Sequence, residues 1–314
     1  MTVERTRVRI KGKDFDVPSA KVGGCTITVN GGWLKNSGIF DEELLEQGDR
    51  PDPISLIDGV GRSALRADIL SFGRAYWQCD IKLEFQAEPD NMAVAAVDSF
   101  DTWWKGLPQA TRRNVRLSEK RGVEVRPVGF DDLLVMGIKK IYDETPVRQG
   151  RHFWHFQKDL RKVREENATY LTRSQFIGAY LKDELIGFIK FIRVDQTAIL
   201  SQILAMEAYR DHKAANALVK CAVELCQQQG LTNLVYGKFD YGGGTDNSLS
   251  EFKRRNGFAE RGFPRYVVPL SAKGRLAVRT GLHRGLRAMV PAPLAGAFRA
   301  ARQRVVTVTQ GHSK

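Results

Sequence analysis

Hydrophobic residues follow two different spacings along the chain. Up to about residue 90 they alternate with polar ones, as in "TRVRIKG" (6–12), "CTITVN" (25–30) and "WQCDIKLEF" (77–85). A period of two is typical of half-buried β-strands. Gly-Gly pairs and the turn "RPDP" (50–53) separate these runs, and no long helical pattern interrupts them. The first 97 residues are therefore predicted to be β-rich.

Helical spacing begins at Asp98 and then alternates with strand-like runs as far as residue 270. The pattern predicts two helices divided at Leu107-Pro108, a strand, an amphipathic helix and a polar helix. Three strands, a helix, a short strand, a helix and a last strand follow. In residue ranges, these elements are 98–120, 123–128, 130–145, 157–167, 174–206, 214–230, 232–237, 248–257 and 262–270. A meander followed by βαβαβ predicts an α/β (α+β) fold, with a mixed sheet and helices on both faces.

The last 44 residues differ in charge from the rest. Between Ser271 and Lys314 there are nine basic residues and no acidic one. Residues 293–306 can form an amphipathic helix with Leu294, Phe298 and Ala301 on one side. We therefore divide the chain into a β-rich region (1–97), a mixed region (98–270) and a basic helical tail (271–314), and expect the tail to be capable of peripheral contact with an anionic membrane.

Composition narrows the class of partner. Lys and Arg number 49 against 36 Asp and Glu, so the formal net charge is +13, which indicates an anionic partner such as nucleic acid or a phosphate-bearing carrier. The four cysteines show no metal-ligand spacing, the N-terminus is charged from residue 4, and no apolar run approaches the ~20 residues that span a bilayer. We expect a cytoplasmic protein with reduced cysteines and no metal.

Residues 208–230, "AYRDHKAANALVKCAVELCQQQG", resemble the strand-to-helix segment of the GNAT acyltransferases. In that family a Q/R-x-x-G-x-G/A turn presents backbone N–H groups at a helix N-terminus to a pyrophosphate. Here the turn is Arg210 to Ala215, with Lys213 in place of the central glycine. The resemblance implies donor-phosphate binding by Arg210, Lys213, Ala215 and Asn216. The Lys213 side chain crowds coenzyme A and suits an RNA phosphate or an altered carrier.

Four further segments, "LPQATRRNVRLSEKRGVEV", "YLKDELIGFIKF", "LVYGKFDYGG" and "EFKRRNGF", are similar to the FemA/FemB/FemX-like branch of that superfamily. Well-characterised members transfer an amino acid from aminoacyl-tRNA to an amine of a peptidoglycan precursor, and consist of two GNAT-like halves. The resemblance implies a GNAT-like acyltransferase domain at 98–270, with 1–97 as a reduced GNAT-like half. It also implies a co-substrate, aminoacyl-tRNA or acetyl-CoA/acyl-CoA, and no tightly bound cofactor.

The same resemblance implies two catalytic residues, and the loop after the short strand offers a third candidate. Lys253, between Phe252 and Asn256-Gly257, would stabilise the oxyanion of the tetrahedral intermediate. Tyr236, at the end of a strand expected to splay from its neighbour, would protonate the leaving group, and Asp240 would act as general base. The alternatives are a solvated lysine, a tyrosine packed at a strand end, and a structural loop acid. Glu207 is a second candidate base, and Arg254 and Arg255 are assigned to the general basic surface.

The segment "PVRQGRHFWHF" (146–156) falls where GNAT enzymes shape the acceptor site. Arg148 and Arg151 would bind phosphate or carboxylate, while Trp154 and His155 would stack on a sugar or base. The alternative is a loop packed on the core through its aromatic residues. A further electrostatic track is predicted on the second helix, at Arg112, Arg113 and Arg116.

These features predict an N-acyltransferase that acts by direct attack of an amine on the carrier-bound acyl group. The acceptor would be an amine-bearing small molecule, peptide or cell-envelope precursor, with tRNA as a partner on the donor side. The alternative is a non-catalytic module that binds nucleic acid or another polyanion through its basic surface. The oligomeric state is left open.

Overall fold

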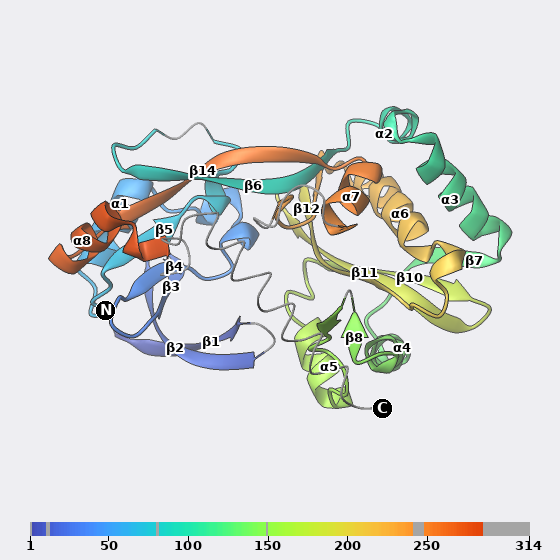
Figure 1. The fold of residues 1–314 in the computed structure, drawn as a ribbon, viewed down its shortest axis with the longest axis horizontal. Coiled ribbons are helices and arrows are strands. Elements are labelled where there is room, and N and C mark those ends of the chain that lie inside the picture. The colour runs from blue at the N-terminus through green and yellow to red at the C-terminus, as the bar shows by residue number, and fades with distance from the viewer. Residues whose placement is uncertain (1, 11–12, 80–81, 149, 241–247, 285–314) are drawn as a thin grey trace, which may run out of the picture.

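The computed structural model of this protein describes residues 2–10, 13–79, 82–148, 150–240 and 248–284. A 12-stranded sheet runs through it in the order β1-β2-β3-β4-β5-β14-β6-β13-β12-β11-β10-β7. Figure 1 shows a lobe at each end of this sheet, with β6 and β14 crossing between them. We call them the N-terminal lobe (β1–β5, α1 and α8) and the C-terminal lobe (α2–α7 and β7–β13).

The N-terminal lobe is β-rich, as the alternating pattern predicts. Its strands are β1 (Glu4–Ile10), β2 (Lys13–Val22), β3 (Cys25–Asn30), β4 (Asn36–Ile39) and β5 (Ile69–Phe72). The pattern did not predict α1 (Pro53–Gly61), a nine-residue helix. It begins at the turn "RPDP", where the Asp52 side chain accepts a hydrogen bond from the Ser55 amide at 2.9 Å and Pro53 occupies the first turn.

Two long antiparallel strands join the lobes. β6 (Gln86–Ala96) and β14 (Ala259–Pro269) pair along most of their length. β14 continues the sheet to β5, while β6 continues it to β13 (Asn233–Val235). The domain boundary predicted at residue 97 stays a prediction, and it falls directly after a strand that pairs on both sides of the junction.

The C-terminal lobe has the predicted order of elements. Two helices and a strand come first, α2 (Phe100–Gly106), α3 (Gln109–Lys120) and β7 (Val123–Val128). The rest are α4 (Asp132–Asp143), β8 (Val147–Arg148), β9 (Arg151–His152), α5 (Leu160–Asn167), β10 (Ser174–Leu181), β11 (Glu184–Val194), β12 (Thr197–Ala205), α6 (Ala214–Gln228) and α7 (Ser248–Arg255). Asp131 and Asp159 cap α4 and α5 by accepting a hydrogen bond from a first-turn amide.

Helices cover both faces of the sheet in this lobe, which confirms the predicted fold class. On β11, the Phe188 ring contacts Tyr142 of α4, with ring centroids 6.4 Å apart. A Cβ at the adjacent Gly187 would lie 3.2 Å from Leu218 of α6. Neighbouring residues of a strand face opposite sides, so α4 and α6 lie on opposite faces, as Figure 1 also shows.

The chain after residue 270 returns to the N-terminal lobe. α8 (Ala272–Thr280) is capped by Ser271 and packs on the sheet, with Ala277 buried against Ile69 and Val267. The amphipathic helix predicted at 293–306 lies outside the described residues. None of the helices within the described ranges is long and apolar enough to cross a membrane.

Candidate active site

The predicted splay between two neighbouring strands is present in the sheet. β12 and β13 run parallel and pair only from Thr197–Asn233 to Ile199–Val235, although β12 continues to Ala205. After Val235 the chain stays beside β6, where the Tyr236 amide donates to the Ala93 carbonyl at 2.8 Å. The second half of β12 and Tyr236 therefore diverge, and leave an opening in the sheet.

A cavity of about 1140 Å³ lies at this opening, between the two lobes. Three predicted site residues line it, namely Tyr236, Asp240 and Trp154. The N-terminal lobe contributes Arg9, Asp41, Glu43, Leu44 and Arg74, and β6 contributes Asp90, Asn91 and Met92. The volume is slightly above the roughly 300–1,000 Å³ that is usual for small-molecule sites.

Lys253 does not line the cavity but lies directly behind Tyr236, which does. It is fully buried, its Nζ lies 4.5 Å from the centroid of the Tyr236 ring, and Nζ donates to the Lys238 carbonyl oxygen at 2.5 Å. Burial lowers the pKa of Lys253 to about 8. Its neighbours Arg254 and Arg255 are exposed and pair with Glu251, so the surface assignment of these two arginines is confirmed.

A buried chain of charges supports the loop that carries Asp240. The Asp90 carboxylate lies 2.6 Å from the Lys238 Nζ and 2.8 Å from the Arg265 Nε. Burial by itself would raise the pKa of Asp90, but the hydrogen bonds from Lys238 and Arg265 outweigh it and hold the pKa below its usual value. The pairing allows a carboxylate that is 5% exposed to stay ionised beside the cavity.

Asp41 and Tyr170 reach into the cavity from opposite lobes. The Tyr170 hydroxyl donates to the Asp41 carboxylate at 2.5 Å. Burial raises the pKa of both groups. Both residues have left-handed backbones, with φ of 48° and 55°, a conformation that costs a non-glycine residue about 1 kcal/mol or more.

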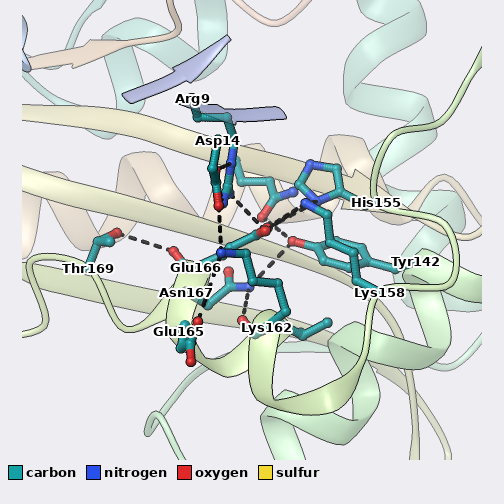
Figure 2. Close-up of polar contacts among 12 residues, drawn as sticks. Arg9, Asp14, Tyr142, His155, Lys158, Lys162, Glu165, Glu166, Asn167 and Thr169 are labelled. Carbon is teal, nitrogen blue, oxygen red and sulfur yellow. Dashed lines mark hydrogen bonds and ion pairs between the residues drawn. The ribbon is translucent and has the colours of Figure 1, made fainter. Parts of the chain in front are cut away.

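A polar network ties the N-terminal hairpin to α5 beside the cavity (Figure 2). The carboxylate of Glu166 lies 2.9 Å from the Arg9 guanidinium and 2.7 Å from the Lys158 Nζ. A second ion pair joins Asp14 to Lys162 at 2.7 Å. The two lobes are therefore held together at this edge of the cavity by charges from both sides.

The predicted acceptor residues separate into two groups. Trp154 is 52% exposed and lines the cavity, and Arg151 lies on the exposed strand β9. Arg148 is half-buried, and its guanidinium donates to the Ala205 carbonyl at 2.9 Å and to Glu144 at 2.9 Å. The His155 ring packs against Tyr142 with the ring centroids 4.4 Å apart, and burial lowers the pKa of His155. Through these contacts Arg148 and His155 stabilise the fold around them. Their roles in binding the acceptor stay predictions.

The predicted donor turn is positioned at the N-terminus of α6. Lys213 has the left-handed conformation (φ 56°) that glycine adopts without cost, so the turn keeps its shape despite the substitution. Arg210 is exposed, and Ala215 lies half-buried in the first turn of the helix. The Asn216 side chain donates to Asn256 at 3.0 Å, which joins α6 to the end of α7. Donor binding by these residues stays a prediction.

Sequence reasoning missed several residues that build the site. Asn91, Asp41 and Tyr170 line the cavity, and Lys190 is a 2%-exposed lysine whose Nζ donates to the Asn167 and Thr169 carbonyls just before Tyr170. Glu144 accepts hydrogen bonds from the amides of Glu207 and Ala208, and so fixes the chain before the donor turn. An isolated lysine within the apolar run of β11 was the one available sequence signal, because a lysine in such a run needs buried acceptors.

A comparison with protein families matches residues 138–240 to the acetyltransferase (GNAT) family. This part of the chain is a GNAT acetyltransferase domain. It contains the splayed strands, the donor turn, Tyr236 and Asp240. The expected resemblance to the GNAT superfamily is thereby confirmed for this part of the chain, and a GNAT domain supports acyl transfer as the type of reaction. The match leaves out Asn91 and Lys253, which reach the GNAT domain from outside it.

Solved structures resemble the chain well beyond the GNAT domain. FemX matches with a TM-score of 0.51 at 11% identity, over 84% of this chain and 87% of its own. The C-terminal domain of a putative lysylphosphatidylglycerol synthetase from Agrobacterium fabrum matches with 0.54 at 12%, over 84% and 88%. L-PGS from Bacillus licheniformis matches with 0.53 at 12%, over 83% and 85%. At these identities the likeness shows a shared fold, and it includes the N-terminal lobe. No curated protein gave a significant match.

Proposed function

We propose that this protein is an N-acyltransferase, which moves an acyl or aminoacyl group from aminoacyl-tRNA or acyl-CoA to an amine by direct attack. The observation that carries the proposal is the cavity at the splayed strands of a GNAT domain, lined by both Tyr236 and Asp240. Its position puts a proton acceptor and a proton donor in one space large enough for an acceptor molecule.

The reaction needs two proton transfers. The acceptor amine, in the cavity, gives a proton to the Asp240 carboxylate as its nitrogen attacks the acyl carbon. The new C–N bond forms with a tetrahedral oxyanion, and the bond to the carrier breaks as the oxyanion collapses. The Tyr236 hydroxyl then gives its proton to the departing sulfur or oxygen. The buried Lys253 cation, 4.5 Å from the Tyr236 ring, favours the negative charge that develops on the oxyanion and on Tyr236.

The donor turn supports aminoacyl-tRNA over acyl-CoA. Lys213 adds a point charge where a glycine would leave the backbone open, and a flexible cation contacts a phosphate without needing a close backbone approach. α3 packs on α6 and carries the exposed Arg113 and Arg116. These charges would add to that of Lys213 in binding a long polyanion.

The test is transfer of a labelled acyl group to amines. The purified protein is incubated with labelled aminoacyl-tRNAs or with labelled acetyl-CoA, and with lysine-bearing peptides, amino sugars or diamines. Label should move to an amine with at least one donor. Tyr236→Phe should lower the rate by about 10²-fold. Tyr180→Phe, on β10 away from the cavity, is the matched control. Absence of transfer from both donors to every amine would refute the proposal.

The polyanion-binding alternative makes a different prediction. A binding module would bind RNA with an affinity that depends strongly on salt, and substitution of Lys253 would not change that affinity. Binding of unacylated tRNA at two salt concentrations, by wild type and Lys253→Met, distinguishes the two. Equal binding by both proteins, with no transfer by either, would favour the module.

A further inference from the structure

The turn from Tyr236 to Asp240 is held by backbone hydrogen bonds to elements on both of its sides. On the β6 side, Tyr236 and Gly237 exchange hydrogen bonds with Ala93. On the α7 side, the Lys238 carbonyl accepts from Lys253, and the Phe239 carbonyl accepts from the Ser250 hydroxyl at 2.8 Å. The turn that presents Asp240 to the cavity is therefore held between a strand and a helix that both lie outside the GNAT domain.

One side chain makes the remaining contacts. The Asn91 Oδ1 accepts from the Phe239 amide at 2.8 Å and from the Asp240 amide at 3.0 Å. Its Nδ2 donates to the Asp240 carbonyl at 3.3 Å. Asn91 thus binds both polar groups of the Asp240 backbone, and it lines the cavity beside Asp240.

Asparagine suits the binding of the Asp240 backbone but is an unusual residue within a β-strand. Asn91 lies within the eleven-residue strand β6, where asparagine is disfavoured and β-branched or aromatic residues are preferred. An amide side chain combines an acceptor that can receive two N–H groups with a donor that can return a bond to a carbonyl. A local choice that opposes the secondary structure is a mark of a functional position.

We propose that Asn91 is a positioning residue, which fixes the backbone of Asp240 so that its carboxylate meets the acceptor amine in the cavity. The inference rests on the proposed acyl transfer for its catalytic consequence, but the clamp itself is testable without it. Misplacement of a reacting group by about 1 Å can cost about 10²-fold in rate, so removal of the clamp should lower kcat and leave the KM for the donor unchanged.

The experiment compares Asn91→Ala, Asn91→Asp and the control Asn36→Ala, which removes an exposed strand asparagine in the N-terminal lobe. Amide hydrogen exchange at Phe239 and Asp240 reports the clamp in the intact protein. We expect exchange at least about tenfold faster in Asn91→Ala and unchanged in Asn36→Ala. Wild-type exchange rates in Asn91→Ala would overturn the clamp, whatever the activity.

The pH profile of kcat tests the catalytic part. In Asn91→Ala we expect kcat to fall by about 10–100-fold. Asn91→Asp keeps an acceptor for the two amides but places a second negative charge beside Asp240, so the acid limb of its profile should move to higher pH. An unchanged kcat in Asn91→Ala, or an unmoved acid limb in an active Asn91→Asp, would overturn the positioning role. If the wild type transferred no acyl group from any donor, the proposed function would be refuted instead. The amide exchange rates would still show whether Asn91 fixes the Asp240 backbone.

Discussion

The burial of Lys253 gives a sharp prediction for Lys253→Met, which removes the ammonium and keeps an unbranched chain of similar length. Burial lowers the pKa of Lys253 from its ordinary 10.5 to about 8. Each pKa unit corresponds to about 1.36 kcal/mol, so the buried cation costs the fold at most about 3 kcal/mol at pH 7 and about 1 kcal/mol at pH 10. Between these pH values the unfolded chain binds more protons at this site, and the wild type gains stability.

In Lys253→Met, this pH-dependent contribution to the free energy of unfolding is absent. At pH 7, release from the desolvation cost offsets the loss of the hydrogen bond to the Lys238 carbonyl, worth about 1–3 kcal/mol, so the variant should lie within about 2 kcal/mol of the wild type. From pH 7 to 10 it should become less stable relative to the wild type by about 2 kcal/mol.

Urea denaturation of both proteins at intervals from pH 7 to 10 measures this difference. Lys190→Met is the matched control, because burial also lowers the pKa of Lys190 to about 8 but its Nζ contacts the Asn167–Thr169 backbone instead of Tyr236. Both variants should show the same trend in stability with pH, and Lys253→Met should lose about 10²–10³-fold in kcat. A stability difference that stays flat from pH 7 to 10 would refute the argument that Lys253 is a desolvated cation.

Three further substitutions have defined outcomes. Tyr236→Phe keeps the ring over the Lys253 cation, so its unfolding free energy by urea titration should change by less than about 1 kcal/mol while transfer falls. Glu166→Gln removes the carboxylate that pairs with Arg9 and Lys158, although Arg9 keeps its pair with Asp14, and should cost about 2–4 kcal/mol by the same titration; a loss below about 0.5 kcal/mol would mean that the network does not stabilise the fold. Gly257→Ala should lower the Tm, because φ is +82° and a Cβ would lie 2.5 Å from the Trp103 Nε1; an unchanged Tm by calorimetry would contradict this.

Much of the secondary structure follows from local rules. Alternation predicts the strands of the N-terminal lobe, and capping residues such as Asp131 mark where helices begin. The α1 helix is an exception, because a segment of nine residues is too short for a helical periodicity to be recognised in the sequence. The last strand is also longer than predicted, as β14 begins at Ala259 because it pairs with β6 from that residue.

The cavity-lining residues that were named from the sequence all come from short segments. Tyr236 and Asp240 lie in one segment and Trp154 in another, while Lys253, from a third, lies behind the lining. Their surroundings come from far away in sequence: Asn91 contacts Asp240 across 149 positions, and Tyr170 contacts Asp41 across 129. No local pattern encodes such pairs, because a single asparagine or aspartate has the same local signature in a turn as in a site.

By itself, the sequence determined the order of strands and helices, the GNAT-like turn at Arg210–Ala215 and the lysine before Asn256-Gly257, because backbone propensity and short motifs act within a few residues. Tertiary structure decided that Lys253 is buried while Arg254 and Arg255 are exposed, which follows from the face that α7 turns to the core. It also decided that β6 and β14 join two lobes around a cavity. Burial and long-range pairing depend on how distant segments pack, and that packing sets both the pKa of Lys253 and the position of Asp240.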